Sequence, residues 1–238
     1  MPQTATKPGR RHARQLVKET WEAQANLSFF LGLLVVCVFV LPLTRVVEDH
    51  FNVYGDLAYS LVLISGIAIG WRRTKLFYVG VVIGVAGLAV RWLAWWHPSV
   101  DALREPTTLL AILMLVVILL EQVFKRGPVS GSRLQGAIAA YLLLGLSWAH
   151  AYAIFSGNHP HAFMTTGSAP TTVGAWTYFS FITLTTVGYG DIIPTAPVAR
   201  MLAMGEALTG QLYLAVLVAR LVALQVSGSI VSPEKKDE

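Results

Sequence analysis

Charged residues are scarce in this sequence. Asp, Glu, Lys and Arg make up 13% of its 238 residues, whereas a typical soluble domain has about 25%. Such a small amount of charge cannot cover the surface of a water-soluble fold of this size, which nearly excludes a soluble enzyme. Hydrophobic residues account for 55% of the chain, which also excludes intrinsic disorder. Because these residues occur in long runs, the sequence predicts a membrane protein with several spans.

Cysteine is also nearly absent. Cys37 is the single cysteine of the sequence and lies within an apolar run. This excludes a disulfide framework and argues against a cysteine-based metal site, and no cofactor is expected. The beginning of the sequence is polar, and the first apolar run is not followed by a small-residue cleavage site, so no secretory signal peptide is expected.

Six apolar runs are predicted to be membrane spans. They lie at 27–47, 56–71, 76–96, 107–124, 134–155 and 197–224. A helix needs about 20 residues to cross the hydrocarbon core, and the run at 56–71 is the short one. The predicted units are an N-terminal segment at 1–25, a four-helix unit at 26–126, a two-helix unit at 127–226 and a polar tail at 227–238. The stretch at 9–24 is compatible with an interfacial helix or with a solvated basic arm.

Basic residues are distributed unevenly between the two sides of these spans. With the N-terminus inside, 14 basic residues are cytoplasmic, and Arg45, Arg91, Arg104 and Arg200 lie on the outer side. The positive-inside rule therefore predicts a multi-pass protein of the plasma membrane with both termini cytoplasmic. The outer side also has six acidic residues, Asp56 among them, against four arginines. Its net charge is therefore −2, which would attract cations. Because the basic residues report on topology here, no nucleic-acid partner is expected.

The segment between the last two runs contains the most informative pattern. Residues 176–194 read W-T-Y-F-S-F-I-T-L-T-T-V-G-Y-G-D-I-I-P. Gly188 and Gly190 tolerate positive φ angles, so the backbone around them can alternate in handedness and aim successive carbonyl oxygens to one side. A narrow tube of carbonyl oxygens can replace the water shell that an ion loses when it crosses a membrane.

In this motif the chain resembles the tetrameric potassium channels, whose selectivity filter reads T-V-G-Y-G. The resemblance covers residues 134–224. The carbonyl groups that it assigns to potassium ions are those of Thr186, Val187, Gly188 and Tyr189, with Gly190 completing the filter. It also implies that the Thr186 hydroxyl forms the innermost ring. The side chains of Val187 and Tyr189 would point outward into protein and fix the diameter by packing.

One such loop in each chain implies an assembly of four chains. A single filter strand cannot surround an ion, and non-helical backbone at membrane depth must be buried in protein or line water. The resemblance therefore implies a homotetramer of an all-α membrane protein. In each chain, four N-terminal transmembrane helices precede a pore module of an outer helix, a re-entrant pore helix at about 175–186, the filter and an inner helix. The negative C-terminal end of the pore helix would favour a cation in the central cavity.

Three positions of the predicted pore helix differ from those of many relatives. Tyr178 and Phe179 stand where many have paired tryptophans, and Ile182 stands where some have a glutamate. A carboxylate pair behind the filter is therefore absent. We expect Tyr178 and Thr185 to support the filter, with the Tyr178 hydroxyl bonded to Asp191. Alternatively, Asp191 is a solvated loop carboxylate.

A charge ladder for voltage sensing is missing. Voltage sensing usually needs arginine at every third position of the fourth span, and the run at 107–124 contains no basic residue. Arg91 lies near the outer end of the third run and is interpreted as an interfacial anchor beside Trp92, Trp95 and Trp96. The four N-terminal spans are then a scaffold or an unknown sensor. Because the tail after the last span is short, no cytoplasmic ligand-binding domain is expected in this chain.

The last two spans supply the remaining candidates. Gly210 has the spacing of the hinge glycine in the family's inner helix, and it either bends the helix or lets it pack closely. The helical face predicted to line the cavity and its constriction contains Gln211, Leu214, Ala215, Val218, Ala219 and Val222. Glu206 either bonds behind the filter, couples gating to pH, or has only a packing role. His150 is interpreted as a helix-packing residue.

The function expected from these features is passive, potassium-selective conduction without strong voltage gating, and not enzymatic catalysis. A weakly selective cation channel, a secondary transporter and a non-conducting accessory protein are the alternatives. The intact G-Y-G triplet argues against the first. The unlike halves of the chain, of which one holds a re-entrant segment, argue against the second. Nothing in the sequence excludes an accessory role for the first four spans.

Overall fold

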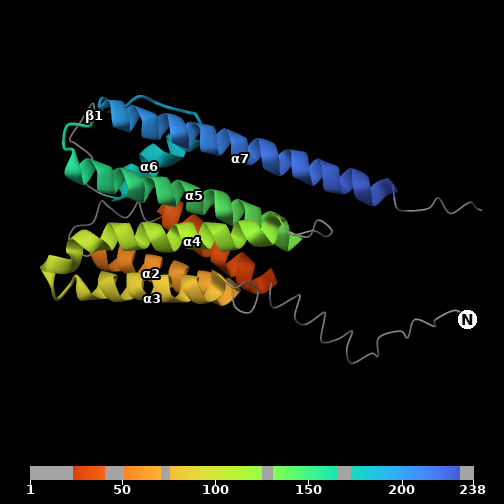
Figure 1. Cartoon of the computed structure of the whole chain (residues 1–238), viewed down its shortest axis with the longest axis horizontal. Helices are drawn as coiled ribbons and strands as arrows, with labels where there is room; N and C mark the ends of the chain where they lie inside the picture. Colours follow the sequence, from red (N-terminus) through yellow and green to blue (C-terminus); the bar gives the residue numbers. More distant parts are fainter. Residues whose placement is uncertain (1–23, 41–50, 71–75, 125–130, 166–172, 231–238) are drawn as a thin grey trace, which may run out of the picture.

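The computed structural model describes residues 24–40, 51–70, 76–124, 131–165 and 173–230, which are mostly helical (Figure 1). The helices are a segment at 24–40 that ends in the π-helical turn η1 (Val36–Val40), α2 (Phe51–Gly70), α3 (Leu76–Leu93), the 3-10 turn η3 (Pro98–Leu103), α4 (Arg104–Phe124), α5 (Gly131–Asn158), α6 (Val173–Leu184) and α7 (Pro197–Ile230). The predicted helical class is confirmed. Most of the predicted N-terminal segment at 1–25 and the end of the predicted tail at 227–238 lie outside the described residues.

Three of the described helices are long and apolar enough to cross a membrane. They are Pro98–Phe124, Gly131–Asn158 and Pro197–Ala223. Shorter apolar helices at Gln24–Phe39, Gly55–Gly66 and Tyr78–Leu93 overlap the first three predicted spans. The ends predicted for the first two spans, at 47 and 71, lie outside the described residues. The apolar helices indicate a membrane protein.

Proline residues stand at the starts of two of the spanning segments. Pro197 is the first residue of α7, a position where a missing N–H breaks no intrahelical hydrogen bond. Pro98 opens η3, and the backbone N–H of Arg104 bonds to the Asp101 carbonyl, so η3 continues directly into α4. The fourth helix therefore begins earlier than the predicted residue 107.

A small two-stranded sheet joins the two ends of the segment between α5 and α7. β1 (Phe163–Thr165) pairs antiparallel with β2 (Ile192–Pro194). The backbone N–H groups of Thr195 and Ala196 also bond to the Ala162 carbonyl, at 2.9 and 3.2 Å. The sheet thus closes a loop that contains α6 and the G-Y-G triplet. The strands were not predicted because three residues are too few to show an alternating pattern.

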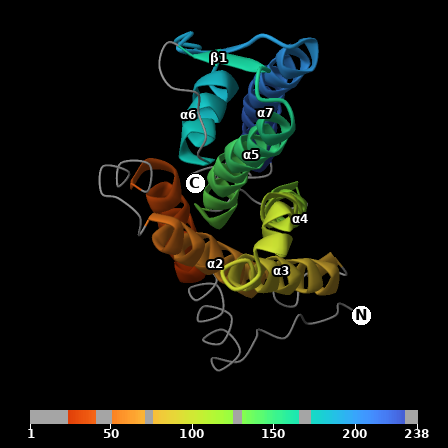
Figure 2. The ribbon, with the colours of Figure 1, turned by 90° about the vertical axis from the view of Figure 1, so that its left-hand side faces the viewer.

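The helices pack in layers, with α4 between two groups. Figure 2 shows α2 and α3 on one side of α4, and α5, α6 and α7 on the other. The larger hydrophobic core is shared by the first helical segment, α2, α4 and α5. Its fully buried members include Phe30, Val62, Ile112 and Leu143. A smaller core joins α5 to α6 around Tyr152, Trp176 and Phe179. The N-terminal helices therefore rest on the α5 of their own chain, and α5 positions α6.

Candidate functional site

The G-Y-G triplet follows directly after α6. α6 ends at Leu184, close to the end predicted for the helix at 175–186. The backbone N–H groups of Val187 and Gly188 then both bond to the Ile182 carbonyl, at 2.8 and 3.1 Å. These bonds fold the chain back onto the last turn of α6, so the helix determines where the triplet lies.

The backbone of this segment alternates in handedness. In the described part of the chain, the three residues with positive φ are Thr186 at 60°, Gly188 at 54° and Gly190 at 79°. The alternation predicted from the two glycines is confirmed. Thr186 belongs to the same alternation. Its positive φ was not predicted, because a β-branched residue rarely adopts positive φ. Such strain costs about 1–3 kcal/mol and is concentrated at functional sites.

Val187 and Tyr189 alternate with the positive-φ residues and are uncovered in the single chain. Their exposed fractions are 53% and 72%. Exposed apolar side chains in a membrane protein can be covered by lipid or by another chain. Their role in fixing a diameter stays a prediction, because the protein that they would pack against is not part of the single chain.

α7 runs beside the triplet with its predicted cavity face uncovered. Gln211 Nε2 donates to Thr186 Oγ1 at 3.4 Å, which joins the start of this face to the start of the predicted filter. The other residues of the face are also exposed: Leu214, Ala215, Val218, Ala219 and Val222. Further along α7, Arg220 Nη2 donates to the Phe124 carbonyl at 2.5 Å, and its guanidinium lies 4.6 Å from the centre of the Phe124 ring. This contact ties α7 to the last residue of α4.

Gly210 is a point of direct contact between α7 and the end of α6. A Cβ atom added at Gly210 would lie 2.2 Å from the Leu184 carbonyl oxygen. α7 continues as a helix on both sides of this position. The close approach therefore accounts for a glycine here by packing, and the alternative role as a hinge stays a prediction.

Gly210→Ala is expected to push α7 away from the end of α6, because the alanine Cβ cannot share the space of the Leu184 carbonyl. We expect a loss of about 1–3 kcal/mol in stability, measured as a lower melting temperature of the purified protein. Gly205→Ala is the matched control, since its Cβ would lie 3.6 Å from Trp148, an ordinary contact. An unchanged melting temperature with altered gating would instead support the hinge.

Tyr178 on α6 interacts with Asp191, which follows the triplet. The Tyr178 hydroxyl lies within hydrogen-bonding reach of the Asp191 carboxylate. A tyrosine hydroxyl is protonated at neutral pH and can donate. Asp191 Oδ1 is buried without a hydrogen-bond partner among the described residues. The Thr185 hydroxyl donates to the Phe181 carbonyl at 2.6 Å, and its support of the filter stays a prediction.

Tyr178→Phe should remove the donor that we expect to hold Asp191 beside the filter. Losing one hydrogen bond of about 1 kcal/mol should speed inactivation by about fivefold, while potassium selectivity stays largely intact. Single-channel recording of the reconstituted protein measures both properties. Unaltered inactivation would show that the pair does not support the filter.

Glu206 is completely buried where α5, α6 and α7 meet. The Tyr152 hydroxyl donates to Glu206 Oε2 at 2.6 Å, and Ser180 Oγ lies 2.5 Å from Glu206 Oε1. All three residues are 0% exposed. Of the roles considered for Glu206, the structure shows the hydrogen-bonded position against α6.

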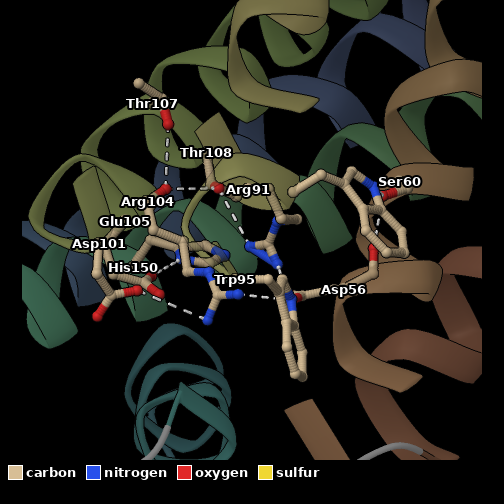
Figure 3. Close-up of polar contacts among 11 residues, drawn as sticks. Asp56, Ser60, Arg91, Trp95, Asp101, Arg104, Glu105, Thr107, Thr108 and His150 are labelled. Atoms are coloured by element: carbon tan, nitrogen blue, oxygen red, sulfur yellow. Dashed lines mark hydrogen bonds and ion pairs between the residues drawn. The ribbon is translucent and has the colours of Figure 1, made fainter. Parts of the chain in front are cut away.

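Arg91 is part of a buried ionic cluster and is not an interfacial anchor. It is 4% exposed, and its Nη1 donates to Asp56 Oδ1 at 2.6 Å while Nη2 donates to Thr108 at 3.2 Å. Arg104 and Trp95 donate to the other Asp56 oxygen, at 2.6 and 2.8 Å (Figure 3). The anchor interpretation was wrong, and Asp56, placed on the outer side by the sequence, is buried. Burial is tolerated because the Asp56 carboxylate is paired with both guanidinium groups and accepts from Trp95 as well.

His150 connects the start of α4 to α5. Its Nδ1 lies 2.5 Å from Glu105 Oε2, and its ring lies edge-on to Tyr59 at 5.1 Å. His150 therefore packs between helices, as expected. The bond to Glu105 was not predicted, because the two residues are 45 positions apart. Within the described ranges, no three His, Cys, Asp or Glu side chains are grouped so as to hold a metal ion.

Known proteins resemble the part of the chain that contains this site. Residues 138–226 match the model of a protein family described as ion channel. Two pore potassium channel c from Oryza sativa subsp. japonica is 33% identical over 87 residues, which are 36% of this chain and 17% of the rice protein. The chain therefore spans only a small part of that relative's length. The stretch matched by the family model includes α6, the triplet and most of α7. This stretch is therefore similar to an ion-channel family and to part of a potassium channel.

Proposed function

We propose that four copies of this chain form a potassium-selective channel in the plasma membrane and that potassium ions flow through it passively. The observation that carries the proposal is the positive φ at every second residue, Thr186, Gly188 and Gly190, directly after α6. This alternation suits a row of carbonyl oxygens that replaces the water of a potassium ion. The similarity to an ion-channel family and to part of a potassium channel supports the same function.

Surfaces left uncovered in the single chain support an assembly of four. α7 is mostly uncovered along its apolar length, whereas α5 is mostly buried. Val187 and Tyr189 are exposed as well, and one filter strand cannot enclose an ion. Neighbouring copies would cover Val187, Tyr189 and the part of the uncovered α7 surface that does not line the cavity. In this proposal the first helical segment, α2, α3 and α4 are four N-terminal spans, α5 to α7 are the pore module, and both termini are cytoplasmic.

Potassium flux through the purified, reconstituted protein is the decisive test. We expect a reversal potential that follows the potassium gradient, strong exclusion of sodium, and a protein mass near four times 25.9 kDa after subtraction of detergent. Equal permeability to the two ions would indicate a weakly selective cation channel. Uphill movement coupled to another gradient would indicate a transporter, and the absence of flux would indicate an accessory protein.

We further propose that the exposed face of α7 from Gln211 to Val222 lines the cavity and closes it by steric contact and dewetting. Cysteine substitutions at Ala215 and Ala219 should react with internal thiol reagents, preferentially in the open state. The native Cys37 is buried, which keeps the background reaction low. Unreactive cysteines at both positions would exclude this face as the cavity lining.

The open probability should depend only weakly on voltage. Each elementary charge that crosses the full field contributes about 2.3 kcal/mol per 100 mV. Arg91 and Arg104 are both bonded to Asp56, so neither is free to cross the field. Gating currents or conductance–voltage curves measure the effective charge. A value of many elementary charges per channel would show that a sensor exists in the N-terminal helices.

A further inference from the structure

Glu206 on α7 has one partner on each of the two helices packed against it. Tyr152 comes from α5 and bonds to Oε2, and Ser180 comes from α6 and contacts Oε1. Glu206 forms no ion pair with Lys, Arg or His among the described residues. An ionised carboxylate that is buried without a cation is strongly disfavoured. The hydrogen bonds of Glu206 indicate whether its carboxyl group is protonated.

Three oxygen–oxygen contacts surround Glu206: Ser180 with Gly145, Ser180 with Glu206, and Tyr152 with Glu206. Each contact needs one proton, and the three protons are available only if the Glu206 carboxyl group is protonated. Ser180 Oγ lies 2.7 Å from the Gly145 carbonyl oxygen as well as 2.5 Å from Glu206 Oε1. Its single hydroxyl proton serves one acceptor, and the Gly145 carbonyl can only accept. With the serine proton on Gly145, the proton between Ser180 and Glu206 must belong to the carboxyl group. The Tyr152 proton fills the remaining contact at Oε2.

Successive turns of α7 contact three successive points on the way to the filter. Glu206 meets Ser180, and Gly210, one turn later, meets Leu184, one turn after Ser180. The next residue, Gln211, bonds to Thr186. α7 is therefore in register with the last turn of α6 over this stretch, and Glu206 is the first polar contact of the series.

We propose that Glu206, as a neutral carboxylic acid, is the positioning residue that holds the last turn of α6 between α5 and α7 and thereby keeps the filter in its geometry. It donates to Ser180, accepts from Tyr152, and so joins the three helices of the pore module. This role rests on the proposed function as a potassium channel. The charged form would offer two acceptors and no donor, and would break the chain of bonds that runs through Ser180 to Gly145.

Glu206→Gln and Glu206→Leu together distinguish the acid from the carboxylate. A glutamine amide accepts through its oxygen and donates through its nitrogen, which reproduces the pattern of the neutral acid. We expect Glu206→Gln to keep the potassium-to-sodium permeability ratio of the natural protein. Glu206→Leu should lower the ratio about tenfold, the scale expected when buried hydrogen bonds are lost. A Glu206→Gln ratio as low as that of Glu206→Leu would overturn the proposal.

Ser180→Ala tests the link to α6 with a close control. Ser147 is also buried on the neighbouring helix, but its hydroxyl donates to Leu143 within α5 at 2.8 Å. We expect Ser180→Ala to lower the permeability ratio severalfold on the same scale of hydrogen-bond loss, and Ser147→Ala to leave it unchanged. Equal ratios in the two alanine variants would refute the positioning role.

Infrared spectroscopy and thermal melting of the full-length assembly do not depend on conduction. The natural protein should show the C=O band of a protonated carboxylic acid that is missing from Glu206→Gln, and the two proteins should melt at the same temperature. Absence of that band would overturn the assignment of the acid form. If the natural protein showed the band but conducted no potassium, the proposed function would fail while the protonation and the helix contact stood.

Discussion

Gly188→Ala is expected to abolish or scramble the preference for potassium over sodium. Gly188 has a φ of 54°, and the left-handed region costs an L-residue with a Cβ about 1–2 kcal/mol. The structure shows no atom within 4 Å of the added Cβ, so the cost arises from the backbone and not from a clash in the single chain. If the alanine at position 188 relaxed to negative φ, a backbone carbonyl would turn away from the row of carbonyl oxygens that is proposed to bind potassium. We expect the permeability ratio to fall by about tenfold or more, measured from reversal potentials.

Gly157→Ala is the matched control for this prediction. The Cβ added at Gly157 also has nothing within 4 Å, but the residue has no positive φ. It should therefore conduct with normal selectivity. Tyr189→Ala should lose selectivity for a different reason, because it removes the packing expected to hold the diameter. Normal selectivity in Gly188→Ala would contradict the assignment of the filter.

Asp56→Ala should be the most destabilising substitution in the N-terminal helices. It would leave the Arg91 guanidinium buried without its ion-pair partner and would remove the acceptor of Arg104 and Trp95. Breaking a buried pair from one side costs about 3–5 kcal/mol. The free energy of unfolding in mixed detergent micelles, titrated with a denaturing detergent, measures this loss.

Two further variants test the cause of that loss. Asp101 is 63% exposed and lies 3.9 Å from Arg104, so Asp101→Ala should change the free energy of unfolding by no more than about 1 kcal/mol. Combining Asp56→Leu with Arg91→Met should recover part of the stability, because both buried charges are then replaced by apolar groups. Equal effects of Asp56→Ala and Asp101→Ala would show that the cluster does not stabilise the fold.

The sequence by itself determined the helical class, the approximate positions of the helices and the conformation around Gly188 and Gly190. These properties are local. A long apolar run favours a helix wherever backbone groups must bond within their own segment, and a glycine accepts positive φ because it has no Cβ. The position of α6 before the triplet was likewise predicted within about two residues.

Only the tertiary structure decided which buried polar groups meet. Arg91 and Asp56 are 35 residues apart, and Glu206 is 26 residues from Ser180 and 54 from Tyr152. Hydropathy describes each of these residues alone, so Arg91 was interpreted as an anchor and Glu206 was left with several roles. The energy of a buried charge or acid depends on the partners that other helices bring to it. Those partners are placed by the packing of α2 and α4 against α3 and of α5 and α6 against α7, which no local pattern in the sequence records.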